Sequence, residues 1–144
     1  MIRRARSGDA RAIGDVFVAA RAEMTYLPEQ PSDAAFRDFI AGEIMRRDEV
    51  WIAEAEGRVV GFLTLERDLL DHIYVHPDAQ NQGIGSALLE VGKSTRPEGF
   101  RLWVFQKNEG ARRFYERHGL RVVTLTDGRE NMEQEPDALY EWLP

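Results

Sequence analysis

The chain has 144 residues, enough to bury a core without staples, and we expect a single domain over residues 1–144. It contains no cysteine, which excludes a disulfide framework, a thiol nucleophile and a thiolate metal site. The net charge of −6 argues weakly against binding nucleic acid or an anionic membrane, and weakly for a cationic partner. No signal-peptide pattern and no apolar run of the roughly 18 residues needed for a transmembrane helix is present, so a cytoplasmic protein is expected.

Hydrophobic spacing and turn residues predict an alternation of strands and helices. The first part of the chain should form a strand over 2–6, a helix capped by Ser7 or Asp9 with an apolar stripe over 10–20, and a helix capped by Ser32 or Asp33 with apolar positions over 36–44. Two strands within 50–66, joined by a hairpin turn at Glu56–Gly57, a strand over 69–76 and a short helix over 84–91 should follow. The last part should form a strand over 100–105, a helix capped by Asn108 and stopped by Gly119, a strand over 120–126, a polar loop over 127–137 and a strand over 138–143. The strand over 69–76 has apolar residues on both faces, as expected of a strand buried in the middle of a sheet.

The resulting order is β-α-α-β-β-β-α-β-α-β-β. We expect an α/β (α+β) fold with a mixed, mostly antiparallel sheet and helices on both faces.

The segment QNQGIG, Gln80 to Gly85, follows a strand and leads directly into a helix. Glycines allow the backbone to approach a ligand closely, and the first N–H groups of a helix are unpaired and lie at the positive end of its dipole. This arrangement predicts a phosphate-binding turn that would fit a diphosphate.

Three kinds of phosphate-binding turn can be compared by their spacing. A dinucleotide fingerprint is a poor match, because Leu88 stands where its third glycine would be. A P-loop around Gly92–Ser94 is also a poor match, because Ala87 stands where its first glycine would be and the intervening residues have helix character. The pattern Q-x-x-G-x-G remains, with Gln80, Gly83 and Gly85.

This turn resembles the coenzyme A signature of the GCN5-related N-acetyltransferases (the GNAT superfamily). About 30 residues downstream, NEGARRFYERHGL, Asn108 to Leu120, is similar to the second signature of the same family. The order of elements is also similar, so the resemblance covers most of the chain. It implies acetyl-CoA (coenzyme A) as the donor substrate, and no metal.

The resemblance also implies a set of donor contacts. Backbone N–H groups of the turn would hold the diphosphate, and the strand over 71–76 would pair with the pantetheine arm where neighbouring strands splay apart. The residues expected to bind the donor are Ile73, Tyr74, Val75, Gln80, Asn81, Gln82, Gly83, Ile84, Gly85, Ser86, Asn108, Ala111, Phe114 and Tyr115.

Tyr115 is the tyrosine of the second motif, and the resemblance implies that it protonates or hydrogen-bonds the departing CoA thiolate. A phenol titrates at about 10 and a thiol at about 8.5, so hydrogen bonding is the safer expectation. Packing beside Phe114 would also explain the residue. The candidates for the base that accepts the amine proton are Glu66, Asp71 and His72 around the central strands, and Glu23 or Tyr26 in the first helix and the loop after it.

The acceptor in such folds usually lies between the loop joining the first two helices and the loop before the last strand, here 21–33 and 127–137. Glu23 and Tyr26 are the candidate substrate-binding residues. The late loop carries five acidic residues and one arginine, which would suit a cationic amine, although a solvated loop explains the same charges.

These features predict an acyltransferase that moves an acetyl group from acetyl-CoA to a small-molecule or peptide primary amine by direct attack in a ternary complex. A catalytically silent acyl-CoA sensor or partner-binding module, O-acetylation and a longer acyl donor stay open. Exposed late strands are compatible with a homodimer.

Overall fold

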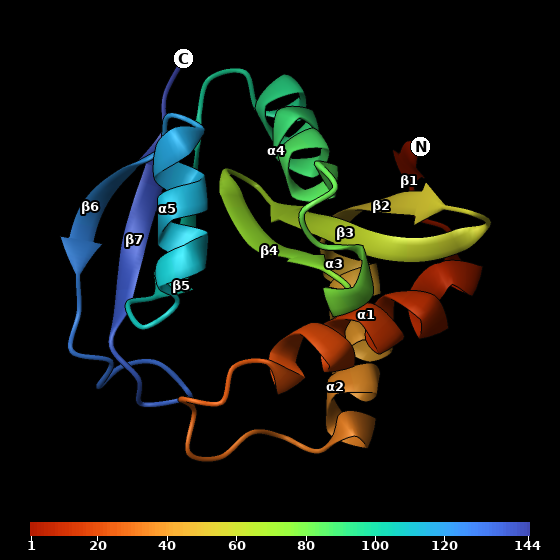
Figure 1. Cartoon of the computed structure of the whole chain (residues 1–144), viewed down its shortest axis with the longest axis horizontal. Coiled ribbons are helices and arrows are strands. Elements are labelled where there is room, and N and C mark those ends of the chain that lie inside the picture. The colour runs from red at the N-terminus through yellow and green to blue at the C-terminus, as the bar shows by residue number, and fades with distance from the viewer.

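Seven strands form one mixed sheet in a computed structural model that describes residues 1–144 (Figure 1). The spatial order is β1-β2-β3-β4-β5-β7-β6, and all neighbours are antiparallel except β4 and β5. The strands are β1 (Ile2–Arg4), β2 (Glu49–Ala55), β3 (Arg58–Glu66), β4 (Leu69–Val75), β5 (Phe100–Phe105), β6 (Arg121–Leu125) and β7 (Asp137–Trp142).

Helices cover both faces of this sheet, which confirms the predicted fold class and order of elements (Figure 1). The helices α1, α2 and α3 lie on one face of the N-terminal strands, α4 lies on the other, and α5 packs beside β5 and β7 (Figure 1). The helices are α1 (Ala10–Ala22), α2 (Asp33–Phe39), α3 (Met45–Arg47), α4 (Ile84–Thr95) and α5 (Glu109–Arg117), with a π-helical turn over Ile40–Ile44 and 3-10 turns over Ser7–Asp9 and Pro77–Ala79. None of the helices is long and apolar enough to cross a bilayer.

Local signals explain several of these boundaries. The Ser32 hydroxyl caps α2 by accepting the Ala35 N–H at 3.1 Å. Glu56 and Gly57 both have positive φ, 54° and 75°, as a two-residue hairpin turn requires. The Asp9 carboxylate accepts instead from the Arg6 N–H and does not cap α1, so that expectation was wrong.

Successive side chains of the central strands point to opposite faces of the sheet, so the hydrophobic core is divided between these two faces. Phe62 on β3 packs with residues of α1 and α2, whereas Leu63, its neighbour, packs with Leu88 of α4 and with the strands of the C-terminal half. All three side chains are fully buried. The strands that carry the candidate site are therefore fixed from both sides.

The sheet opens between β4 and β5. These parallel strands share one residue pair, Leu69 with Arg101, and then diverge toward their carboxyl ends. As a result β4 is half-buried along most of its length, unlike the fully buried central strand that its apolar sequence predicted. The carboxyl ends of parallel strands are the usual place for a ligand in open α/β sheets.

The sheet ends at β6, which is exposed along its whole length. Val122 and Leu125 on this edge strand are 46% and 58% exposed. The homodimer compatible with such an edge stays a prediction.

Candidate functional site

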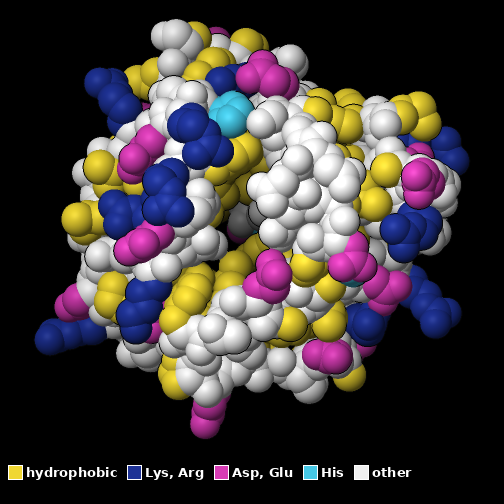
Figure 2. Space-filling model, in the orientation of Figure 1, with side chains coloured by type: hydrophobic (Ala, Val, Ile, Leu, Met, Phe, Trp, Pro, Cys, Tyr) yellow, Lys and Arg dark blue, Asp and Glu magenta, His cyan; other side chains and the backbone are white.

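A cleft of about 1570 Å3 opens where β4 and β5 diverge, and Figure 2 shows it as the hollow at the centre of the molecule. Its walls come from the end of α1, the strands β4 and β5, the turn before α4, helix α5 and the loop between β6 and β7. Pockets for one small ligand usually measure about 300–1000 Å3, so this cleft has room for two substrates side by side. Basic side chains gather along the rim formed by α5 (Figure 2), and one of them, Arg117, lines the cleft.

The edge of β4 that faces the cleft has free backbone groups. In an antiparallel pair, residues bonded to the neighbouring strand alternate with residues whose N–H and C=O point the other way. His76 donates its N–H to the Val60 carbonyl of β3 at 2.8 Å. In this register the backbone N–H and C=O groups of Ile73 and Val75 point away from β3. The carbonyl of Val75 indeed accepts from the Gln80 side chain at 3.2 Å, on the side away from β3. This edge can pair with an extended ligand.

The glycine turn positions the start of α4 at the same cleft. Gly83 is the N-cap residue with φ of 81°, and an added Cβ would meet nothing within 4 Å. The first bond of the helix runs from the Ala87 N–H to the Gly83 carbonyl at 3.0 Å, so the N–H groups of residues 84–86 have no partner inside the helix. Unpaired N–H groups at a helix N-terminus are able to bind an anion.

Tyr115 reaches the cleft from α5. The Asn108 side chain caps this helix by accepting the Ala111 N–H at 3.2 Å, and both residues line the cleft, so capping and ligand contact are compatible. Tyr115 is 7% exposed and packs against Phe114, with ring centroids 5.5 Å apart. Burial raises the pKa of the Tyr115 phenol, which therefore stays protonated at neutral pH and can donate a hydrogen bond.

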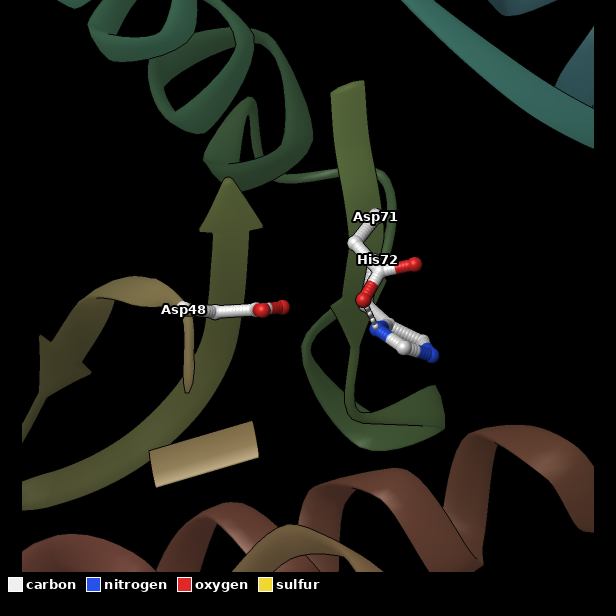
Figure 3. A group of neighbouring side chains, drawn as sticks. All are labelled: Asp48, Asp71 and His72. Atoms are coloured by element: carbon white, nitrogen blue, oxygen red, sulfur yellow. Dashed lines mark ion pairs between the residues drawn. The ribbon is translucent and has the colours of Figure 1, made fainter. Parts of the chain in front are cut away.

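A bulge in β4 brings Asp71 and His72 together (Figure 3). Thr64 pairs with His72 and Leu65 with Leu70, so Asp71 is the extra residue. Consecutive strand residues normally point to opposite faces, but here the Asp71 carboxylate lies 3.4 Å from Nδ1 of His72. Thr64 Oγ1 lies 3.2 Å from the same nitrogen. Asp71 and His72 both line the cleft.

Asp48, the residue before β2, points toward this pair (Figure 3). Its side chain is fully buried and its Oδ2 has no hydrogen-bond partner. Burial raises the pKa of Asp48. Burial alone would also raise the pKa of Asp71, but His72, Asp48 and the Arg47 guanidinium together lower it below its usual range. Asp71 is therefore ionised at neutral pH.

Ligand-type atoms of Asp48, Asp71 and His72 lie within 4.8 Å of one another, a spacing that a metal ion could use. However, the Arg47 guanidinium already contacts Asp48 at 2.9 Å and Asp71 at 2.8 Å. A second cation would be repelled by this one, so we assign no metal to the cluster. Glu66, a predicted base, also pairs with Arg47, at 2.7 Å, and does not line the cleft.

One end of the cleft is formed by the loop after α1 and the loop before β7. Arg21, 7% exposed, donates to Glu133 of the late loop at 3.3 Å and joins these two walls. Tyr26 has a buried hydroxyl without a partner, and burial raises the pKa of Tyr26 to about 12. Glu23 lines the cleft but also accepts from the Gln80 side chain at 3.2 Å, beside the glycine turn. The acidic residues of the late loop that line this end are Asp127, Glu130, Glu133 and Asp137.

Most of the residues predicted from the sequence line this one cleft, and two do not. Glu66 holds Arg47, and Gln82 lies outside the lining. Two residues of the site, Arg21 and Asp48, were not predicted from the sequence. Arg21 could have been found, because it falls four residues after Phe17 on the apolar face of its helix. Asp48 gives no such signal, because its role depends on the bulge at Asp71.

A family model described as an acetyltransferase (GNAT) domain matches residues 46–122 of the chain. The peptidyl-lysine N-acetyltransferase YiaC of Escherichia coli K12 is 35% identical over 74 residues, which is 51% of this chain and 50% of that protein. The chain thus matches about half the length of several such relatives.

Solved structures match over nearly the whole chain. The solution structure of apo-form YjaB from Escherichia coli has a TM-score of 0.80 at 23% identity and covers 99% of this chain and 96% of that one. A PaiA N-acetyltransferase from Thermoplasma acidophilum in complex with coenzyme A has a TM-score of 0.75 at 21% identity and covers 100% and 98%. At these identities the likeness establishes the fold.

Proposed function

Because the chain belongs to the GNAT acetyltransferase family, we propose that residues 1–144 act as one acetyl-CoA-dependent N-acetyltransferase. The proposed acceptor is a primary amine, with a peptidyl lysine as the first candidate, since YiaC carries the name peptidyl-lysine N-acetyltransferase. The acidic residues at one end of the cleft, such as Glu130, favour an acceptor that arrives as a cation.

The observation that carries this proposal is the free edge of β4 beside the start of α4. The N–H and C=O groups of Ile73 and the N–H group of Val75 match an extended chain with amides, and the N–H groups of residues 84–86 match a diphosphate. Coenzyme A contains both parts in that order. Gly85 and Ser86, at the start of α4, line the same cleft as the β4 edge.

The chemistry requires a new N–C bond, a broken C–S bond and one proton moved from nitrogen toward sulfur. The amine nitrogen attacks the thioester carbonyl, and we assign the Ile73 N–H to the carbonyl oxygen as negative charge develops there. Tyr115, protonated, hydrogen-bonds the thiolate as the C–S bond breaks.

Among the predicted bases, His72 is the one that we assign. Asp71 has a lowered pKa and is too acidic to accept a proton near neutrality, and Glu66 is outside the cleft. Asp71 instead orients the His72 ring from 3.4 Å. His72 accepts the amine proton directly or through one water molecule.

The test is an assay of CoA release from acetyl-CoA with lysine peptides and a panel of small amines. Tyr115→Phe should lower turnover by about a hundredfold, the lower range for acid–base help. A change within about twofold of the parent would remove the assignment. Tyr140→Phe is the matched control, because the Tyr140 hydroxyl bonds Glu116 at 2.6 Å outside the cleft.

Mass spectrometry of the product separates N- from O-acetylation, because hydroxylamine removes an ester and leaves an amide. Tight binding of CoA with no product across the whole panel would contradict catalysis and leave a silent acyl-CoA sensor.

A further inference from the structure

His118, at the end of α5, contacts the start of α4 through Ser86. Its Nδ1 lies 2.8 Å from the Phe114 carbonyl, and its Nε2 lies 2.9 Å from the Ser86 hydroxyl. A carbonyl only accepts, so Nδ1 carries a proton. In the neutral ring Nε2 is then an acceptor, and the single hydroxyl proton of Ser86 points to it.

This arrangement conflicts with a phosphate at the same helix end. Ser86 lines the cleft at the third position of α4, among the N–H groups assigned above to the diphosphate. A phosphate oxygen can only accept a hydrogen bond, and Ser86 has one proton to give. If that proton turns to the phosphate, Nε2 of His118 must supply a proton of its own to avoid facing an oxygen lone pair.

We propose that His118 is a positioning residue for the donor: when the diphosphate binds, the Ser86 hydroxyl proton turns from His118 to a phosphate oxygen, and His118 takes up one proton from solvent on Nε2. The ring then donates from both nitrogens, to the Phe114 carbonyl and to Ser86, and its positive charge faces the bound anion through one hydroxyl. No covalent bond changes. This inference rests on the proposed function, because it requires CoA at the glycine turn.

The charges around the ring are compatible with this uptake. From α4, the Lys93 ammonium lies 2.8 Å from the His118 carbonyl oxygen and 3.5 Å from Glu90. On α5, Phe114 stacks on the ring with centroids 4.4 Å apart, and Arg117 precedes it. Lys93 itself packs over the uncharged Trp142 ring of β7, 5.5 Å from its centroid. Glu90 offsets Lys93 but not Arg117, so the incoming diphosphate is the anion that favours a charged His118 ring.

The experiment is calorimetric titration of the protein with CoA in two buffers of different ionisation enthalpy, between pH of about 6 and 8.5, where histidine changes charge. We expect up to one proton to be taken up per CoA bound, and the Kd to rise with pH by up to about tenfold per unit. Ser86→Ala should abolish the uptake, because the link to the phosphate is removed.

His118→Gln is the conservative variant, since its amide can still donate to Ser86 without titrating. We expect its Kd to stay within about threefold of the low-pH value of the parent across the whole range, with no buffer dependence. A merely structural histidine predicts the opposite: affinity lost equally at every pH, with the proton uptake unchanged. CoA binding without proton uptake in the parent overturns this inference and leaves the proposed function standing, whereas no CoA binding overturns both.

Discussion

Gly83→Ala is the substitution that most cleanly separates folding from donor binding. Gly83 has φ of 81°, a conformation that costs an L-residue about 1–2 kcal/mol. A Cβ there would meet no protein atom within 4 Å, so no clash adds to this cost. For a domain of this size the loss corresponds to a fall in Tm of roughly 2–8 °C.

The effect on the donor should be larger. The N–H groups that follow Gly83 point at the proposed diphosphate, and the new methyl group would occupy the open space beside them. Losing one hydrogen bond to a charged group costs about 1.5–3 kcal/mol, which weakens the Kd of CoA by about 10- to 150-fold.

Gly57→Ala supplies the matched control. Gly57 has φ of 75° in the β2–β3 hairpin, and its Cβ would also meet nothing within 4 Å, but it does not line the cleft. Thermal unfolding of the free proteins should show similar losses for both variants, while titration with CoA should show weakening for Gly83→Ala alone. Equal CoA affinities in the two variants would refute the donor site at the turn.

Three further predictions follow from the ionisable groups. Because the pKa of Tyr115 is raised, the phenol stays protonated through alkaline pH. We therefore expect kcat/KM to rise as the acceptor amine loses its proton, with no fall caused by the tyrosine up to about pH 10. A fall in kcat/KM that disappears in Tyr115→Phe would contradict this. Because the pKa of Asp48 is raised and Oδ2 has no partner, Asp48→Asn should leave the free energy of unfolding at about pH 8 unchanged or higher. Asp48→Ala removes the buried carboxylate that accepts from Arg47, although Glu66 and Asp71 still pair with that guanidinium, and should lower this free energy by about 1–3 kcal/mol in urea titrations. Because the pKa of Asp71 is lowered by folding, Asp71 contributes to stability above its unfolded pKa of about 4, and this contribution is lost as the pH falls toward the folded pKa. Asp71→Asn should therefore make the free energy of unfolding fall less steeply at acid pH. An unchanged fall would argue against the pairing of Asp71 with His72 and Arg47.

The order of elements and several element ends could be read from the sequence because local chemistry decides them. Asn108 and Ser32 cap their helices through their own side chains, and Glu56–Gly57 can form only a tight turn. The strand over 100–105 coincides with β5. Asp9 failed as a cap because Arg3 of β1 and the Arg6 N–H donate to its carboxylate, at 2.9 and 2.7 Å.

The opening of the sheet could not be read in the same way. An apolar strand such as β4 has the composition of a fully buried central strand, and its exposure depends on where β5 goes after the pair Leu69–Arg101. Register and bulges are likewise set by the partner strand. Asp71 and His72 therefore appeared as two separate candidate bases, although the bulge makes them one pair.

The most direct test of the account is amide NMR of the labelled protein during titration with CoA. We expect large shifts, or protection from hydrogen exchange, at the amides of Ile73, Val75 and residues 84–86, with little change at Val122 on the far edge strand β6. Saturable CoA binding that leaves the Ile73 and Val75 amides unchanged would contradict the placement of the donor between β4 and β5.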